Sequence, residues 1–208
     1  MVILAPLSES LIYRSAWGYG LVMRALYGRY YGARHAAVAE HVPDGASVLE
    51  LCCGPARMYL GQLRRRTRSY VGLDSSAAFV ERLRRRGVDA RVADVETAEL
   101  PRADIVVMQA SLYHFLPQDR AAAMVERMRA AACERVVISE PVRNLACSRV
   151  GAVARLAAGG TATAGGAQAQ RFDEASLRAL MSRFGPAVLG DAPAPGGREH
   201  VYVLMGTP

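Results

Sequence analysis

An apolar run that ends in a small-residue turn, with Glu50 near its end, constrains this sequence more than any other feature. The run Ser47–Leu51 is rich in strand-forming residues, and Cys52-Cys53-Gly54-Pro55-Ala56 follows it as a turn. The apolar, arginine-rich stretch 58–66 then predicts a helix. A strand, a tight turn and a helix form the first unit of a nucleotide-binding α/β sheet, in which backbone N–H groups approach the ligand. Glu50 is therefore predicted at the carboxyl end of a strand, where open α/β sheets bind ligands.

The pattern of a short apolar strand followed by a helix repeats along the chain. Strands are predicted at 70–73, 90–93, 104–108 and 135–140, and helices at 77–86 and from Pro117 to about Ala132. The strands are apolar on both faces, as central parallel strands must be. These repeats predict an α/β fold with a doubly wound sheet. A helix at 174–184 and two closing strands, 186–189 and 199–205, follow, with Gly196-Gly197 turning between the strands.

Acidic residues come directly after the second and third predicted strands. Asp74 lies 20 residues beyond Gly54, which is the spacing of an acid that accepts both hydroxyls of a bound ribose. The alternative is that Asp74 only caps the next helix, a role also predicted for Ser75 or Ser76. For the first turn, the alternative is a tight strand–helix connection that binds no ligand.

The stretch from Glu50 to Ala56 resembles motif I of the class I S-adenosylmethionine-dependent methyltransferases. Glu50 matches the acid of that motif and Gly54 its middle glycine, while Cys52 and Ala56 occupy the first and third glycine positions. The resemblance implies a seven-stranded, mostly parallel Rossmann-like sheet whose last strand is antiparallel, with S-adenosylmethionine as cofactor and S-adenosylhomocysteine as product. It also implies that Glu50 reaches the methionine ammonium, that Asp94 accepts from the adenine amino group and that the Val95 N–H meets a ring nitrogen. The expected cofactor-binding residues are Glu50, Cys52, Gly54, Asp74, Ser75, Asp94, Val95 and Gln109.

Composition limits the other possibilities. The chain has 208 residues, which fit a single domain at 1–208, with a helical N-terminal lid at 1–42 and the Rossmann-like core at 43–208. Its net charge is +7, and all 26 basic residues are arginines, which excludes a Schiff-base or P-loop lysine. The four cysteines lack metal-ligand spacing, so no metal site is expected and the thiols are interpreted as reduced in a cytoplasmic protein. No signal peptide or membrane span is predicted.

The acceptor side is predicted from the aromatic N-terminus and from the loop after the fourth strand. Tyr13 and Trp17 are expected to bind substrate as part of the lid, although the N-terminal aromatics also fit ordinary core packing. His114 is the candidate base, as a neutral imidazole with a pKa near 7, and Tyr113 beside it is expected to bind substrate. The alternative for His114 is that it packs or orients the pocket without taking a proton.

Two arginine clusters, 64–68 and 82–86, fall at the C-terminal ends of predicted helices, on the opposite edge of the sheet from the ligand. They are interpreted mainly as a solvated face, with a phosphate-binding surface as the alternative, and no nucleic-acid partner is expected. The predicted function is methyl transfer to a small organic molecule by a monomer or homodimer. Two alternatives stay open: a cofactor-binding protein with a cyclase or regulatory role and no methylation, and an RNA methyltransferase.

Overall fold

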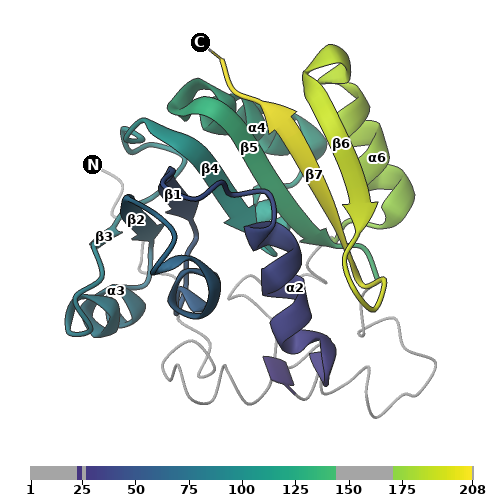
Figure 1. Cartoon of the computed structure of the whole chain (residues 1–208). Helices are drawn as coiled ribbons and strands as arrows, with labels where there is room; N and C mark the ends of the chain where they lie inside the picture. The colour runs from purple at the N-terminus through teal and green to yellow at the C-terminus, as the bar shows by residue number, and fades with distance from the viewer. Residues whose placement is uncertain (1–22, 25–26, 144–170, 208) are drawn as a thin grey trace.

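The structure is a computed structural model and describes residues 23–24, 27–143 and 171–207. A seven-stranded sheet runs through it in the order β3-β2-β1-β4-β5-β7-β6 (Figure 1). Strands β1 to β5 pair in parallel, whereas β7 is antiparallel to both β5 and β6. This is the predicted doubly wound sheet with an antiparallel last strand. The strands are β1 Ser47–Leu51, β2 Ser69–Asp74, β3 Ala90–Val92, β4 Ala103–Gln109, β5 Ala132–Pro141, β6 Val188–Pro193 and β7 Glu199–Met205.

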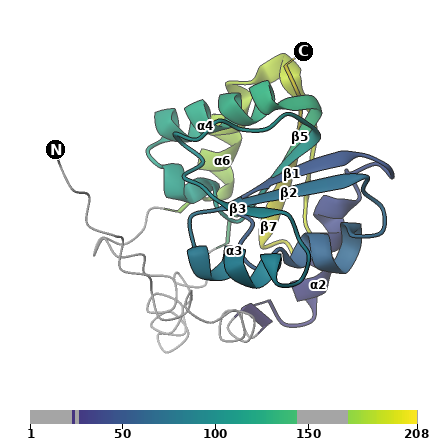
Figure 2. The same ribbon diagram turned by 90° about the vertical axis from the view of Figure 1, so that its left-hand side faces the viewer.

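Helices cover both faces of the sheet (Figure 2). Helices α4 (Gln118–Ala131) and α6 (Glu174–Ser182) pack on one face. The other face carries α2 (Tyr30–Ala39), a π-helical turn (Tyr59–Leu63) and α3 (Ala77–Arg84). Each face encloses its own hydrophobic cluster, so the central strands are buried on both sides as the sequence predicts.

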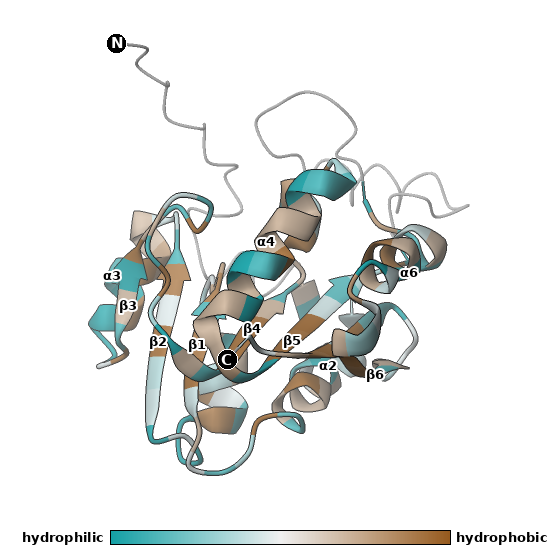
Figure 3. Ribbon diagram, turned by 90° about the horizontal axis from the view of Figure 1, so that it is seen from above, coloured by the Kyte–Doolittle hydropathy of each residue, from teal (hydrophilic) through white to brown (hydrophobic). Residues whose placement is uncertain are grey.

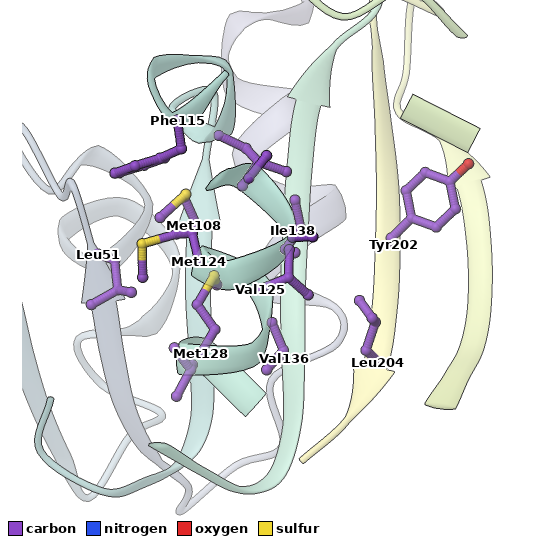
Figure 4. Close-up of a cluster of buried hydrophobic side chains, with 14 of the residues drawn as sticks. Leu51, Met108, Phe115, Met124, Val125, Met128, Val136, Ile138, Tyr202 and Leu204 are labelled. Carbon is purple, nitrogen blue, oxygen red and sulfur yellow. The ribbon is translucent and has the colours of Figure 1, made fainter. Parts of the chain in front are cut away.

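The larger cluster lies between α4 and the middle strands. Met124, Val125 and Met128 of α4 pack toward Val136 and Ile138 of β5 (Figure 4). Viewed from above, hydrophobic colouring follows the inner strands, while α3 and α4 each show hydrophilic turns (Figure 3). The amphipathic pattern of α4 therefore fixes which of its sides meets the sheet.

Two predicted elements differ from the structure. The first closing strand is β6, Val188–Pro193, instead of 186–189, because Pro186 lies in a 3₁₀ turn (Gly185–Ala187). Strand β6 is at the edge of the sheet, where the missing N–H of Pro193 leaves no inner ladder bond unmade. The helix predicted over 58–66 ends in the π-helical turn at Leu63, and the Arg66 guanidinium instead donates to the carbonyl oxygen of Val42 at 2.9 Å.

Removing Met128 tests how much stability the α4 layer supplies. Its side chain is fully buried, so Met128→Ala leaves a cavity and is expected to lower the free energy of unfolding by about 2–5 kcal/mol. Leu189→Ala on β6 is the control, because that side chain is 57% exposed. Urea denaturation of both variants measures the difference. Equal, small losses would show that α4 does not hold this face together.

Candidate functional site

The turn after β1 has the backbone shape that explains its small residues. Cys52, Gly54 and Ala56 have φ values of +52°, +49° and +46°, so all three positions that match motif glycines are left-handed. The Gly54 N–H donates to Asp74 Oδ2 at 2.7 Å, and the Ser76 N–H donates to Asp74 Oδ1 at 2.9 Å. One carboxylate at the end of β2 thus holds the turn after β1 and the entry to α3. Ser76 is the N-cap residue of α3, as one of the two predicted serines, but its side chain makes no cap hydrogen bond.

Backbone strain is concentrated at this edge of the sheet. Among the described residues, the non-glycine positions with positive φ are Cys52, Ala56 and Ala110, which follows β4. A left-handed conformation costs a non-glycine residue about 1–2 kcal/mol. Strained residues that cluster in this way are typical of ligand sites, where the surrounding structure enforces the geometry. The strands β1 and β4 that deliver them are direct neighbours.

Glu50 is buried beneath the turn. It is 4% exposed, and its Oε2 accepts a hydrogen bond of 2.7 Å from the Tyr70 hydroxyl. Burial raises the pKa of the Glu50 carboxyl to about 7, with a further contribution from Asp74. Gly72 makes this packing possible, since a Cβ there would lie 2.8 Å from Cys53 Sγ and 3.0 Å from the Tyr70 hydroxyl. The result is a buried acid that is ready to ionise near neutral pH.

A narrow cavity of about 60 Å³ opens above these residues. Four of the predicted cofactor residues line it: Glu50, Cys52, Gly54 and Gln109. Helix α2 supplies the facing wall through Tyr31, Arg34 and His35, and Arg57 lines the cavity beside the turn. The Gln109 carboxamide binds α2 twice, with Oε1 2.7 Å from His35 Nδ1 and Nε2 donating to the Arg34 carbonyl oxygen at 3.2 Å.

Burial and the neighbouring Arg34 lower the pKa of His35 to about 4. The imidazole is therefore neutral, and Nδ1–H donates to Gln109 Oε1. His35 Nε2 is left as a buried acceptor with no hydrogen-bond partner in the described part of the chain. It adds an unused acceptor to the same cavity wall.

A buried ion pair links α2 to the start of β7. Arg34 contacts Glu199 Oε1 at 2.5 Å, with side-chain exposures of 4% and 1%. Tyr27 donates to the same oxygen at 2.7 Å, and the Ser139 hydroxyl donates to Glu199 Oε2 at 2.8 Å. The carboxylate is thus fully engaged at the start of β7. One signal for this contact is visible in the sequence, because Arg34 is four residues before Val38 and both are buried on the inner face of α2.

The ends of β4 and β5 form a second polar group. Glu140 is 1% exposed, and its Oε2 accepts from the Leu112 N–H at 2.9 Å, whereas Oε1 has no hydrogen-bond partner in the part of the chain that the structure describes. Burial raises the pKa of Glu140 to about 8. The Arg171 guanidinium lies 3.5 Å from the centre of the Tyr113 ring. Tyr113 itself is only 8% exposed and belongs to the core cluster.

His114 lies in the 3₁₀ turn Leu112–Phe115, with its ring 4.0 Å from that of Tyr113. Although the residue as a whole is exposed, desolvation of the imidazole and the charge of Arg171 lower its pKa to about 4. The expected pKa near 7 is therefore wrong. The chief physical reason is desolvation of the imidazole, and the second is the charge of Arg171, which lies 57 residues away in the sequence.

The predicted cofactor residues Ser75, Asp94 and Val95 are not part of the cavity lining. Ser75 is exposed next to Asp74, at the tip of β2. Asp94 is exposed after β3, and its Oδ1 accepts from the Glu96 N–H at 3.0 Å. Val95 is buried in the core. Tyr13 and Trp17 lie outside the described residues.

Comparison with known proteins agrees with this architecture. Residues 48–133 match the family model of a methyltransferase domain. This match spans the strained turn, the acids after β2 and β3, and the tip of β4. Over these residues the chain is similar to that family, and its sheet has the topology of the class I methyltransferase fold. One family relative, trans-aconitate 2-methyltransferase of Mycolicibacterium gilvum (strain PYR-GCK), is 41% identical over 73 residues, which are 34% of this chain and 28% of that protein. The matched part thus spans about a quarter of that relative.

Solved structures show the same fold over nearly the whole chain. Magnesium protoporphyrin IX methyltransferase from Synechocystis PCC 6803 with bound S-adenosylhomocysteine has a TM-score of 0.65 at 15% identity, covering 94% of this chain and 96% of that one. A putative methyltransferase in complex with the Haloferax volcanii Trm112 activator has a TM-score of 0.66 at 13% identity, covering 94% and 98%. At these identities the likeness concerns the fold alone.

The described residues contain no group of three or more His, Cys, Asp or Glu side chains able to hold a metal ion. None of the helices in the described ranges is both long and apolar enough to cross a membrane. The described cysteines Cys52, Cys53 and Cys133 are free thiols.

The raised pKa of Glu50 predicts a pH-dependent stability. The carboxyl has a pKa of about 7 in the fold against an ordinary 4.5, so its neutral form stabilises the fold below pH 4.5, and this stability is lost as the pH rises through 7. Glu50→Gln stays neutral and keeps an acceptor for Tyr70. Its free energy of unfolding relative to the parent should therefore rise by about 2 kcal/mol between pH 5 and pH 8. Urea titrations at both pH values test this, with the exposed Glu81→Gln as control. A flat difference for Glu50→Gln would contradict the assignment.

Proposed function

We propose that the protein transfers a methyl group from S-adenosylmethionine to a small organic molecule and releases S-adenosylhomocysteine. The observation that carries this proposal is the strained turn of Cys52, Gly54 and Ala56 above the buried Glu50, at the carboxyl end of β1. In the class I fold this edge of the sheet is the ligand edge. Relatives support the choice, since their names describe methyl transfer to trans-aconitate and to magnesium protoporphyrin IX.

The cavity residues match the charges of the cofactor's methionine part. Glu50 and the bare His35 Nε2 are acceptors for its ammonium, and Arg34 and Arg57 are cations for its carboxylate. A bound ammonium favours the ionised form of Glu50, so binding would lower the raised pKa of that carboxyl. Asp74 is placed for the ribose hydroxyls and Asp94 for the adenine amino group, in keeping with the class I resemblance.

Helix α2 acts as a lid in this proposal. Pockets that bury a drug-sized ligand measure about 300–1,000 Å³, while the cavity under α2 measures about 60 Å³. The side chains of α2 therefore have to rearrange before a cofactor enters. A lid that closes afterwards excludes water from the reacting methyl group.

Methyl transfer is an in-line displacement. A lone pair of the acceptor attacks the methyl carbon, and the electron pair of the breaking carbon–sulfur bond stays on sulfur. The protein chiefly aligns the two atoms. On the acceptor side, Glu140 is the better-matched base, because its pKa of about 8 lies near the working pH, whereas His114 has a pKa of about 4. We propose that His114 positions the acceptor and that Glu140 accepts its proton where the acceptor carries one.

The proposed activity is tested by incubating the protein with S-adenosylmethionine and a panel of small acceptors, with trans-aconitate as the first probe. Chromatography should detect S-adenosylhomocysteine together with a methylated product. Cofactor binding without any turnover would favour the cyclase or regulatory alternative. Turnover with RNA but with none of the small molecules would identify the RNA alternative instead.

Replacing Asp74 tests the cofactor site. Asp74→Ala removes a charged acceptor for the ribose and releases the Gly54 N–H, so affinity for S-adenosylhomocysteine should fall by about 1–3 kcal/mol, or roughly tenfold or more. Isothermal calorimetry measures the loss. Asp119→Ala is the matched control, since that side chain is 92% exposed on α4. Unchanged affinity in Asp74→Ala would remove this residue from the site.

Replacing His114 and Glu140 separates the two acceptor roles. His114→Ala should raise KM for the acceptor, while Glu140→Gln should lower kcat by about 10²–10⁴-fold for an acceptor that loses a proton. Calorimetry with S-adenosylhomocysteine should show nearly parental affinity for both variants. The base assignment fails if Glu140→Gln retains parental kcat across pH 6–9.

A further inference from the structure

A groove beside the cofactor turn is lined by three arginines. It lies between the turn after β1 and α3, has a volume of about 110 Å³ and is bounded by Pro55, Arg57, Phe79, Arg82, Leu83 and Arg86. Pro55 and Arg57 also line the cofactor cavity, so the two hollows are neighbours. Arg82 and Arg86 were expected only at the opposite edge of the sheet. Instead they line a groove that begins at the ligand edge.

These three arginines belong to the part of the described arginines that forms no ion pair with a carboxylate. Eight others in the described ranges each contact a carboxylate: Arg34, Arg66, Arg68, Arg91, Arg120, Arg129, Arg178 and Arg183. Within the same ranges, Arg57, Arg82 and Arg86 form no ion pair with a carboxylate, and all three are exposed. The acid nearest to them along α3 is Glu81, which is exposed and not part of the lining.

Placing like charges together in this way is unfavourable without a counter-ion. Arg82 lies in the last turn of α3 and Arg86 in the turn that follows the helix, and both line the same groove, where their like charges repel. Arg57 approaches the groove from the other wall. An anion in the groove would meet guanidinium groups from both sides, and its position is limited by a firm apolar base of Phe79 and Leu83, which are 4% and 2% exposed.

We propose that this groove is a binding site for phosphate groups. A phosphate carries up to two negative charges and several acceptor oxygens, which suit several guanidinium forks better than a single one. The phosphate can belong to a small phosphorylated molecule or to the phosphodiester backbone of a nucleic acid. Exposed arginines outside the groove, Arg64, Arg65 and Arg85, would extend the contact for a longer polyanion.

The double variant Arg82→Ala/Arg86→Ala tests the site without touching Arg57, which lines the cofactor cavity. Both side chains are exposed, Arg82 on α3 and Arg86 in the turn after it, so the fold should persist. Arg178→Ala/Arg183→Ala removes the same charge from the region of α6 and is the matched control. Affinity for S-adenosylhomocysteine should be equal in all three proteins, so the result does not depend on methyl transfer.

Two probes distinguish the source of the phosphate: pyrophosphate by calorimetry and a single-stranded 12-nucleotide RNA by fluorescence anisotropy. The parent and the control should bind at least one of them at 150 mM salt, and the double variant should bind it at least tenfold more weakly. For RNA, losing two phosphate contacts should also reduce the slope of log K against log salt by about 1.4. Binding of pyrophosphate alone indicates a small phosphorylated ligand, and binding of RNA alone indicates a nucleic-acid backbone. Absence of binding to both probes, or equal losses in the control, would overturn the proposal.

Discussion

The hydrogen bond from the Gly54 N–H to Asp74 is the contact on which the site depends. It joins the strained turn after β1 to the end of β2, over a distance of 2.7 Å. Cys52 and Ala56 hold left-handed conformations that glycine would adopt at no steric cost. Their combined strain is about 2–4 kcal/mol. A hydrogen bond to a charged group contributes about 1.5–3 kcal/mol, so the Asp74 bond offsets much of the strain and keeps the turn open toward the cavity.

The pKa values of two buried carboxyl groups at the same edge of the sheet are raised toward the neutral pH range. Glu50 and Glu140 have pKa values of about 7 and 8 because burial disfavours their charged forms. They lie at the ends of different strands, β1 and β5, on either side of β4. A cationic sulfonium ligand between them would favour ionisation of both. Burial makes ionisation of these acids unfavourable when no ligand is bound. A positively charged ligand would therefore change their protonation state.

The features of the fold and site that depend on residues close together in the chain could be predicted from the sequence. Glu50, Gly54 and Asp74 could be placed because strand, turn and helix signals fix them locally, and the doubly wound sheet followed from the strand–helix repeats. The contacts of α2 could not be predicted in this way. Tyr27 and Glu199 are 172 residues apart, and their pairing exists only because β7 inserts next to β5. The lowered pKa of His114 was missed for the same reason, since burial of its imidazole and the charge of the distant Arg171 both depend on the folded chain.

The contacts of α2 also determine how the cavity can open. Helix α2 is held at two points, by the buried Arg34–Glu199 ion pair and by the neutral hydrogen bonds of Gln109. Breaking a buried ion pair costs about 3–5 kcal/mol, whereas a neutral hydrogen bond contributes about 0.5–1.5 kcal/mol. Separating α2 from Gln109 therefore costs less than separating it from Glu199. If α2 moves, we expect it to pivot about the Arg34–Glu199 contact. Because Gln109 lines the cavity, a cofactor that binds its carboxamide competes with α2 for the same atoms. If the cofactor binds there, its entry and the release of α2 would be a single exchange of hydrogen bonds.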